Sequence, residues 1–96
     1  MYEHILRQMR EKIRIRSYVM TAHAEEEMND DNFSIFDVER AILTGQVIER
    51  QQDHQTSEWK YLISGQSEFD EAMIVVAKIS VTDKMVVITV YREEQK

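Results

Sequence analysis

The chain contains no cysteine, no proline and only two glycines among its 96 residues. Without cysteine there is no disulfide, no thiolate zinc site and no thiol nucleophile, which fits a reducing compartment. Without proline or a low-complexity stretch, nothing marks an internal linker, so we expect a single domain over residues 1–96. Residues 1–10 carry scattered charges and no apolar run, so we expect no signal peptide, no membrane span and a cytoplasmic protein.

Several familiar catalytic motifs are also missing. The sequence has no glycine-rich phosphate loop, no Gly-x-Ser-x-Gly elbow and no His-Glu-x-x-His helix. These absences exclude the common motif-based enzymes, and we expect no cofactor and no bound metal.

Charge is unevenly distributed along the chain. The net charge of −6 discourages loose binding to nucleic acid. Residues 7–16 nevertheless carry five bases and one acid, whereas residues 17–39 carry seven acids and neither Lys nor Arg. This pattern predicts either two solvated helix faces, paired with each other or with a neighbouring subunit, or a phosphate-contacting edge beside an acidic one.

The amino-terminal half has the periodicity of helices. Apolar spacing predicts an amphipathic helix over residues 3–14, with basic residues on its other face. A shorter helix is expected over residues 21–29, with Thr21 as its N-cap. Ser34 starts a third helix with the residue pattern of a capping box, and Gly45 ends it.

After Gly45 the pattern changes to that of strands. Four strands are predicted over residues 47–51, 58–64, 72–81 and 85–91. We therefore expect an α+β domain with two or three amino-terminal helices on one face of a roughly four-stranded antiparallel sheet. In the last strand, alternation predicts that Val86, Ile88 and Val90 meet the helices. The other, partly open face would take Met85, Val87, Thr89 and Tyr91.

His23 is the first candidate for chemistry. In the first turn of a helix, the dipole favours the neutral imidazole, which suits a general base. Glu27 lies four residues on, so its carboxylate can orient the ring or join it in a metal site completed by Asp53 or His54. The loose spacing disfavours the metal site, and His54 is otherwise a spare catalytic candidate. The alternative for His23 is a structural histidine bonded to the backbone.

Four strand residues are further candidates. The hydroxyls of Thr89 and Tyr91 share a strand face and can flank a bound phosphate. Trp59 and Tyr61 alternate in the same way and can stack a base. Ordinary β-propensity and core packing explain all four equally well.

The order and spacing of several short motifs resemble a known bacterial family, the domain of unknown function 4258, over about residues 17–92. The matching positions are His23-Ala24, Met28, Phe33-Ser34-Ile35, Asp37-Val38, Ala41, Gly45, Ile48-Glu49, Tyr61-Leu62, Gly65, Val75-Val76-Ala77 and Ile88-Thr89-Val90-Tyr91. The basic segment 1–16 precedes this family-like core. The resemblance implies a fold related to RelE-like toxins and other small metal-independent ribonucleases.

The resemblance assigns catalysis to three residues, His23, Thr89 and Tyr91. It implies RNA as substrate and a small zinc-finger antitoxin as partner. Two positions depart from the common family pattern, because Glu27 replaces an arginine and Met73 a histidine. Arg14 or Arg16 would then have to supply the phosphate-binding cation. The alternative is a non-catalytic module that forms a homodimer or binds another protein.

Overall fold

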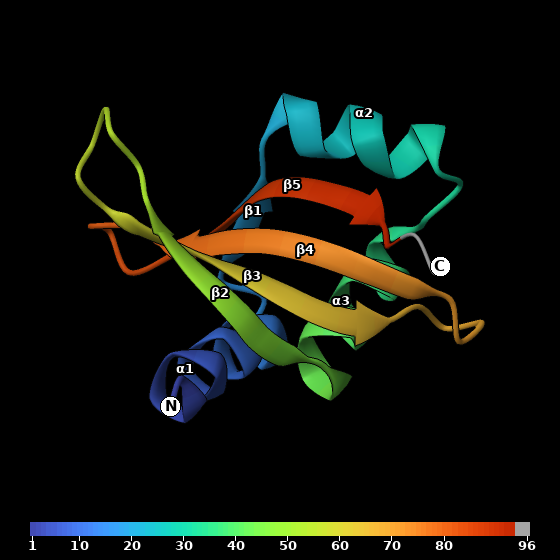
Figure 1. Ribbon diagram of the computed structural model, residues 1–96, viewed down its shortest axis with the longest axis horizontal. Coiled ribbons are helices and arrows are strands. Elements are labelled where there is room, and N and C mark those ends of the chain that lie inside the picture. Colours follow the sequence, from blue (N-terminus) through green and yellow to red (C-terminus); the bar gives the residue numbers. More distant parts are fainter. Residues whose placement is uncertain (94–96) are drawn as a thin grey trace.

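The structure is a computed structural model that describes residues 1–93, and it forms one curved sheet with three helices (Figure 1). Its elements are α1 (Glu3–Arg14), β1 (Tyr18–Met20), α2 (Ala22–Asp30), α3 (Ile35–Thr44), β2 (Gln46–Gln52), β3 (Trp59–Gln66), β4 (Ala72–Ile79) and β5 (Met85–Arg92). The strand order is β1-β5-β4-β3-β2. No helix within residues 1–93 is long and apolar enough to cross a membrane.

The predicted helices are confirmed, and two of them carry the expected caps. The Thr21 hydroxyl accepts the Ala24 N–H at the start of α2. Ser34 and Asp37 form the full capping box of α3, which contributes about 1 kcal/mol. The second carboxylate oxygen of Asp37 accepts the Glu68 N–H at 2.8 Å. The cap of α3 therefore also fixes the loop between β3 and β4.

Helix α1 ends in a Schellman turn that contains no glycine. The Arg16 N–H donates to the Ile13 carbonyl at 3.2 Å, and the Ser17 N–H donates to the Lys12 carbonyl at 2.9 Å. Arg16 consequently has a left-handed backbone with φ of 57°. A residue with a Cβ adopts this conformation at a cost of about 1–2 kcal/mol.

The basic face of α1 is only partly a solvated surface. Arg10 donates to the carbonyls of Ile42 and Gly45 at 3.1 and 2.9 Å, so it bonds the carboxyl end of α3. Lys12 pairs with Asp83 in the β4–β5 turn at 2.8 Å. Two of the five basic residues therefore hold the fold together.

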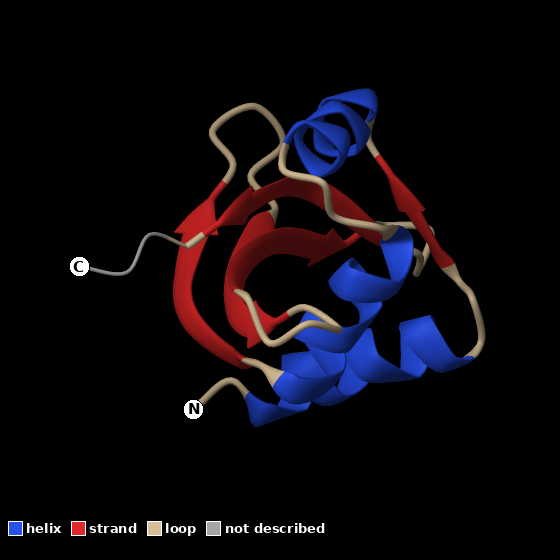
Figure 2. Cartoon of the chain, turned by 90° about the vertical axis from the view of Figure 1, so that its right-hand side faces the viewer, coloured by secondary structure: helices blue, strands red, loops and turns tan. Residues whose placement is uncertain are grey.

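One face of the sheet packs against the helices. Figure 2 shows the strongly curved sheet with α1 and α3 together on one side and α2 apart from them. The core combines apolar residues of all three helices with those of the sheet: Leu6, Met9, Ile13, Ala24, Phe33, Val38, Ala41, Ile42, Ile63, Met73, Val75, Ala77, Met85, Val87 and Val90. β4 is the central strand, and it is buried on both faces.

The prediction of four antiparallel strands is wrong in one respect. The sheet has five strands, because Tyr18–Met20 forms β1 and pairs with β5 in parallel. Three residues are too few to show an alternating pattern, so the sequence gives no signal for this strand. The other three strand pairings are antiparallel as expected.

The predicted faces of β5 are wrong over its first half. Met85 and Val87 are fully buried in the core, whereas Val86 and Ile88 are not. The register of β5 against β4 shifts at Ile88, and this irregularity inserts one residue and inverts the alternation. Val90 therefore reaches the core as predicted.

Candidate functional site

Beyond the end of β1, helix α2 lies along the edge of β5 and bonds to it. The Thr21 N–H donates to the Val87 carbonyl at 3.0 Å, and the Thr21 hydroxyl donates to the Ile88 carbonyl at 3.1 Å. At the other end of the helix, Asp31 accepts the Arg92 N–H at 3.0 Å. Figure 1 shows α2 lying along β5. The helix thus covers a strand edge that would otherwise be open.

Glu27 connects His23 to this edge. One oxygen of the Glu27 carboxylate lies 3.1 Å from His23 Nε2 and accepts the Val90 N–H at 3.2 Å. Thr89 and Tyr91 flank Val90 in β5, and both point to the face away from the core. The structure therefore brings His23 to the strand segment that carries the two predicted hydroxyls.

The geometry assigns the two nitrogens of His23 different tasks. Nε2 lies 3.1 Å from a Glu27 carboxylate oxygen, a position that favours the neutral tautomer with its proton on Nε2. Nδ1 then has the free lone pair. The His23 side chain is 67% exposed, whereas Glu27 is mostly covered. The ring is therefore open to solvent on one side and contacts the Glu27 carboxylate on the other. This arrangement is typical of a general base with an orienting carboxylate.

The sheet face that carries Thr89 and Tyr91 combines apolar strand residues with hydroxyl groups. Thr89 pairs with Val76, and Tyr91 pairs with Ile74. Ile74 and Val76 are only 3% and 7% exposed although they lie outside the main core cluster. The two hydroxyl residues therefore stand on a rigid strand, which is the kind of support that a binding group needs.

The predicted cations lie elsewhere. Arg14 is the last residue of α1 and pairs with Glu11 at 3.0 Å. Arg16 lines a surface depression with Glu25 and Asn29, on the other flank of α2 from His23. The structure brings neither arginine together with His23.

Arg92 follows Tyr91 and was not singled out in the sequence. Its guanidinium donates to the Asp31 carbonyl at 2.8 Å and pairs with Glu71. The same group lies over the Phe33 ring, 4.9 Å from the ring centre. These contacts identify Arg92 as a residue that ties the end of α2 to β5.

Trp59 and Tyr61 lie on the other face of the sheet. Tyr61 packs against the core and meets the Tyr2 ring edge to face at 6.0 Å. The Arg50 guanidinium covers Trp59 at 3.9 Å from the ring centre. The two aromatic candidates are therefore separated from Thr89 and Tyr91 by the sheet itself.

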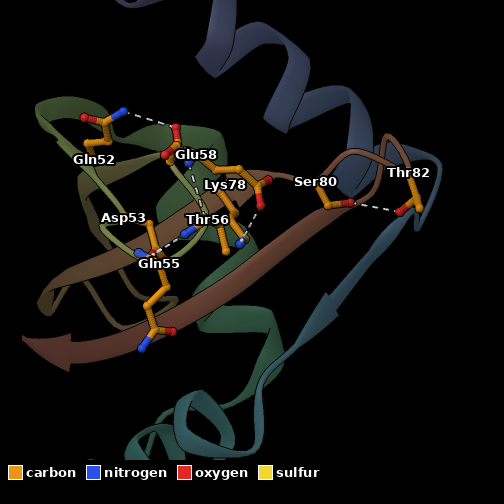
Figure 3. Close-up of polar contacts among 9 residues, drawn as sticks. Gln52, Asp53, Gln55, Thr56, Glu58, Lys78, Ser80 and Thr82 are labelled. Atoms are coloured by element: carbon orange, nitrogen blue, oxygen red, sulfur yellow. Dashed lines mark hydrogen bonds and ion pairs between the residues drawn. The ribbon is translucent and has the colours of Figure 1, made fainter.

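His54 is exposed in the loop between β2 and β3, where neighbouring polar groups bond one another (Figure 3). Asp53 accepts the Gln55 and Thr56 N–H groups, and chiefly the first of these bonds lowers the pKa of its carboxyl. Lys78 pairs with Glu58 at 3.3 Å beneath this loop. Among residues 1–93, no three His, Cys, Asp or Glu side chains are grouped to hold a metal ion.

Fold and site together define a small α+β domain in which a helix carrying histidine and acidic residues covers one edge of a mainly antiparallel sheet. The model of the family described as "Domain of unknown function (DUF4258)" matches residues 20–92, and the chain belongs to this family. No curated protein and no solved structure matches the chain.

Proposed function

We propose that the protein is a RelE-like, metal-independent ribonuclease in which His23 acts as the general base. The observation that carries this proposal is the Glu27 carboxylate, which holds both the His23 ring and the Val90 N–H. An exposed imidazole linked through a carboxylate to the strand that carries two hydroxyl side chains would meet the minimal needs of a reaction that requires a proton acceptor and hydrogen-bond donors but no metal.

The reaction we propose is internal transesterification of RNA. His23 Nδ1 removes the proton of a ribose 2′-hydroxyl, and the freed oxygen attacks the adjacent phosphorus in line with the leaving oxygen. The bond from phosphorus to the 5′ oxygen breaks, which leaves a 2′,3′-cyclic phosphate. The 5′ oxygen then takes a proton from the protonated His23 or from water, so atoms and charges balance.

Thr89 and Tyr91 would bind the phosphate as it becomes more negative. Their side chains project from the face of β5 that lies away from the core, on either side of the Val90 N–H that Glu27 accepts. Hydroxyl donors on a rigid strand can stabilise developing charge without rearrangement. The guanidinium of Arg92 lies on the core side of the sheet, over Phe33, and is bonded by Asp31 and Glu71. No cation of β5 then faces the phosphate, so we expect slow turnover.

The test is cleavage of an end-labelled, single-stranded RNA by purified protein in EDTA. Wild-type protein should give products with cyclic phosphate ends. His23→Ala should be slower by about 100-fold or more, the usual loss of a general base. Cleavage at the wild-type rate by His23→Ala would overturn the assignment.

Glu27→Gln separates orientation from folding. The amide oxygen of glutamine can still accept the Val90 N–H, whereas the carboxylate that orients His23 is lost. We expect a native fold and RNA cleavage slower by about tenfold. His54→Ala is the matched control, because His54 is exposed in a distant loop and its loss should leave the rate unchanged.

A non-catalytic protein-binding module, as a homodimer or with a zinc-finger protein, is the second candidate. The excess of acid over base and the acidic Glu27 beside His23 favour it. Induced expression in bacteria distinguishes the two. Growth arrest by the wild type but not by His23→Ala, at equal abundance, supports the ribonuclease. Normal growth with abundant soluble wild-type protein supports the module.

A further inference from the structure

The two outer strands of the sheet differ in how their free edges are protected. β2 is an exposed edge strand that contains a register shift at Ile48 and the charged pair Glu49 and Arg50. Bulges and charges of this kind discourage pairing with another chain. β1 carries no charged residue, and its exposed Val19 is apolar with 46% of its surface accessible.

The outer side of β1 has backbone groups available for pairing. In a parallel ladder the N–H and C=O of alternate residues point to opposite sides. Ser17 and Thr21 bond inward to β5, so Tyr18 and Met20 turn their backbone groups outward. Within residues 1–93 no strand pairs with this side of β1. Because β1 has only three residues, backbone pairing alone would hold a partner weakly.

A depression beside β1 supplies the side-chain contacts that such a short edge needs. Its volume is about 550 Å³, and strand β1 and helix α2 form most of its wall. Val19, Met20, Met28 and Ile35 give it an apolar lining, and Glu25 and Arg16 add one carboxylate and one guanidinium at its rim. A segment paired with β1 could therefore place an apolar side chain here and a neighbouring cationic group near Glu25.

The acidic residues near the depression favour a basic segment over a second copy of the chain as the partner of β1. Glu25, Glu26 and Asp30 are exposed on α2, and in the described part of the chain none of them forms an ion pair. A second copy paired through β1 would bring two such acidic helices together, and each chain carries a net charge of −6. Like charges at close range oppose that contact, whereas a basic segment is attracted.

We propose that the β1 edge binds an extended, basic segment of a partner protein, which adds a strand beside Tyr18–Met20 and fills the depression with one of its side chains. The main-chain bonds would supply affinity, and the depression and Glu25 would supply specificity. This surface lies on the opposite flank of α2 from His23, so the proposal holds whether or not the protein cleaves RNA.

The test uses a fluorescein-labelled short peptide of alternating valine and lysine, with fluorescence anisotropy as the measurement. Val19→Lys should weaken binding by about tenfold or more, because it places a cation at the edge that the lysines approach. Ile48→Lys is the matched control, since it adds the same charge to an apolar residue that is 56% exposed on the other edge. Its effect on binding should stay within about twofold.

Two further measurements locate the peptide and identify a competing occupant. Amide chemical-shift changes confined to β1 and the adjoining flank of α2 support the proposal, and changes centred on β2 overturn it. Equal binding of a valine and glutamate peptide, or a dimer in light scattering that Val19→Lys dissociates, also overturns it. If Val19→Lys does not fold, Glu25→Lys on the exposed surface of α2 replaces it, with the same expected loss.

Discussion

Helices α3 and α2 are attached to the sheet by different physical means. Under α3, a Cβ built on Gly65 would lie 2.2 Å from the Ala41 carbonyl oxygen, so backbone meets backbone directly. Helix α2 buries only Ala24 fully, and side-chain bonds to the edge of β5, including those of Thr21 and Glu27, supplement this packing. Close packing resists any added atom, whereas side-chain bonds can be removed one at a time.

The candidate functional groups all lie on one of these two sides. The histidine, the orienting carboxylate and the open strand edge all lie on the α2 side, where single polar contacts hold the helix. The α3 side contains the capping box and the glycine contact, which fix the sheet as a scaffold. The candidate catalytic residues thus lie on the α2 side, and the closely packed α3 side supports the sheet that carries them.

The largest expected effect is on the α3 side. Gly65→Ala should lower the free energy of unfolding by about 3 kcal/mol, because the new methyl group must push α3 away from β3. Urea unfolding measures the loss. Gln66→Ala, at the exposed next position, should change stability by less than about 0.5 kcal/mol. Equal stability of Gly65→Ala and wild type would contradict the packing argument.

On the α2 side the effects should be smaller and specific to one bond. Glu27→Ala leaves the Val90 N–H without its acceptor and should cost about 1–2 kcal/mol in urea unfolding. Hydrogen exchange at the Val90 amide should accelerate at the same time. The control is Glu26→Ala, which removes the exposed acid directly before Glu27 and should change stability by less than about 0.5 kcal/mol. The same loss in both variants would show that the helix responds to charge rather than to this bond.

A substitution at Arg16 should raise the free energy of unfolding rather than lower it. Arg16→Gly should raise the free energy of unfolding by about 1 kcal/mol, because glycine adopts the left-handed backbone of this position without steric cost. Arg14→Gly, at the last residue of α1, should instead lower it by about 0.5 kcal/mol. A loss of stability in Arg16→Gly would mean that contacts of the guanidinium outweigh the backbone cost.

Local signals account for the parts of the fold that were predicted correctly. Thr21 and Ser34 mark helix starts through bonds to residues close in sequence, and Gly45 stands where α3 ends, so these helices could be predicted. β1 was missed because its pairing with β5 is made to residues far along the chain. The register shift at Ile88 has no sequence signal either, and it inverted the predicted faces of β5 over its first half.

In the candidate site too, the contact between residues close in sequence was predicted and the long-range contact was not. The spacing of His23 and Glu27 predicted that the carboxylate meets the ring, and the two groups are 3.1 Å apart. The second bond of Glu27, to Val90, joins residues 63 positions apart, and no local pattern announces it. Arg16 was assigned to the site by charge alone, and the tertiary structure puts it on the other flank of α2.

The smallest expected effect concerns the β1 edge at alkaline pH. Tyr18 on β1 donates its hydroxyl proton to Glu39 on α3, and burial together with this bond raises the pKa of Tyr18 to about 12. The folded protein thus holds the proton more tightly than the unfolded chain, whose tyrosine titrates near pH 10. The stabilisation is complete below pH 10 and is lost as the pH rises towards 12.

Tyr18→Phe should therefore show a shallower fall of Tm with rising pH over this interval than the wild type. Tyr91→Phe is the matched control, because it removes a tyrosine of β5 that is 38% exposed, and it should keep the wild-type slope. Since Tyr18 ties β1 to α3, amide exchange in β1 should accelerate at a lower pH than exchange in β2. Simultaneous loosening of both edges would mean that alkaline pH acts on the whole sheet and that this bond has no separate part in holding β1.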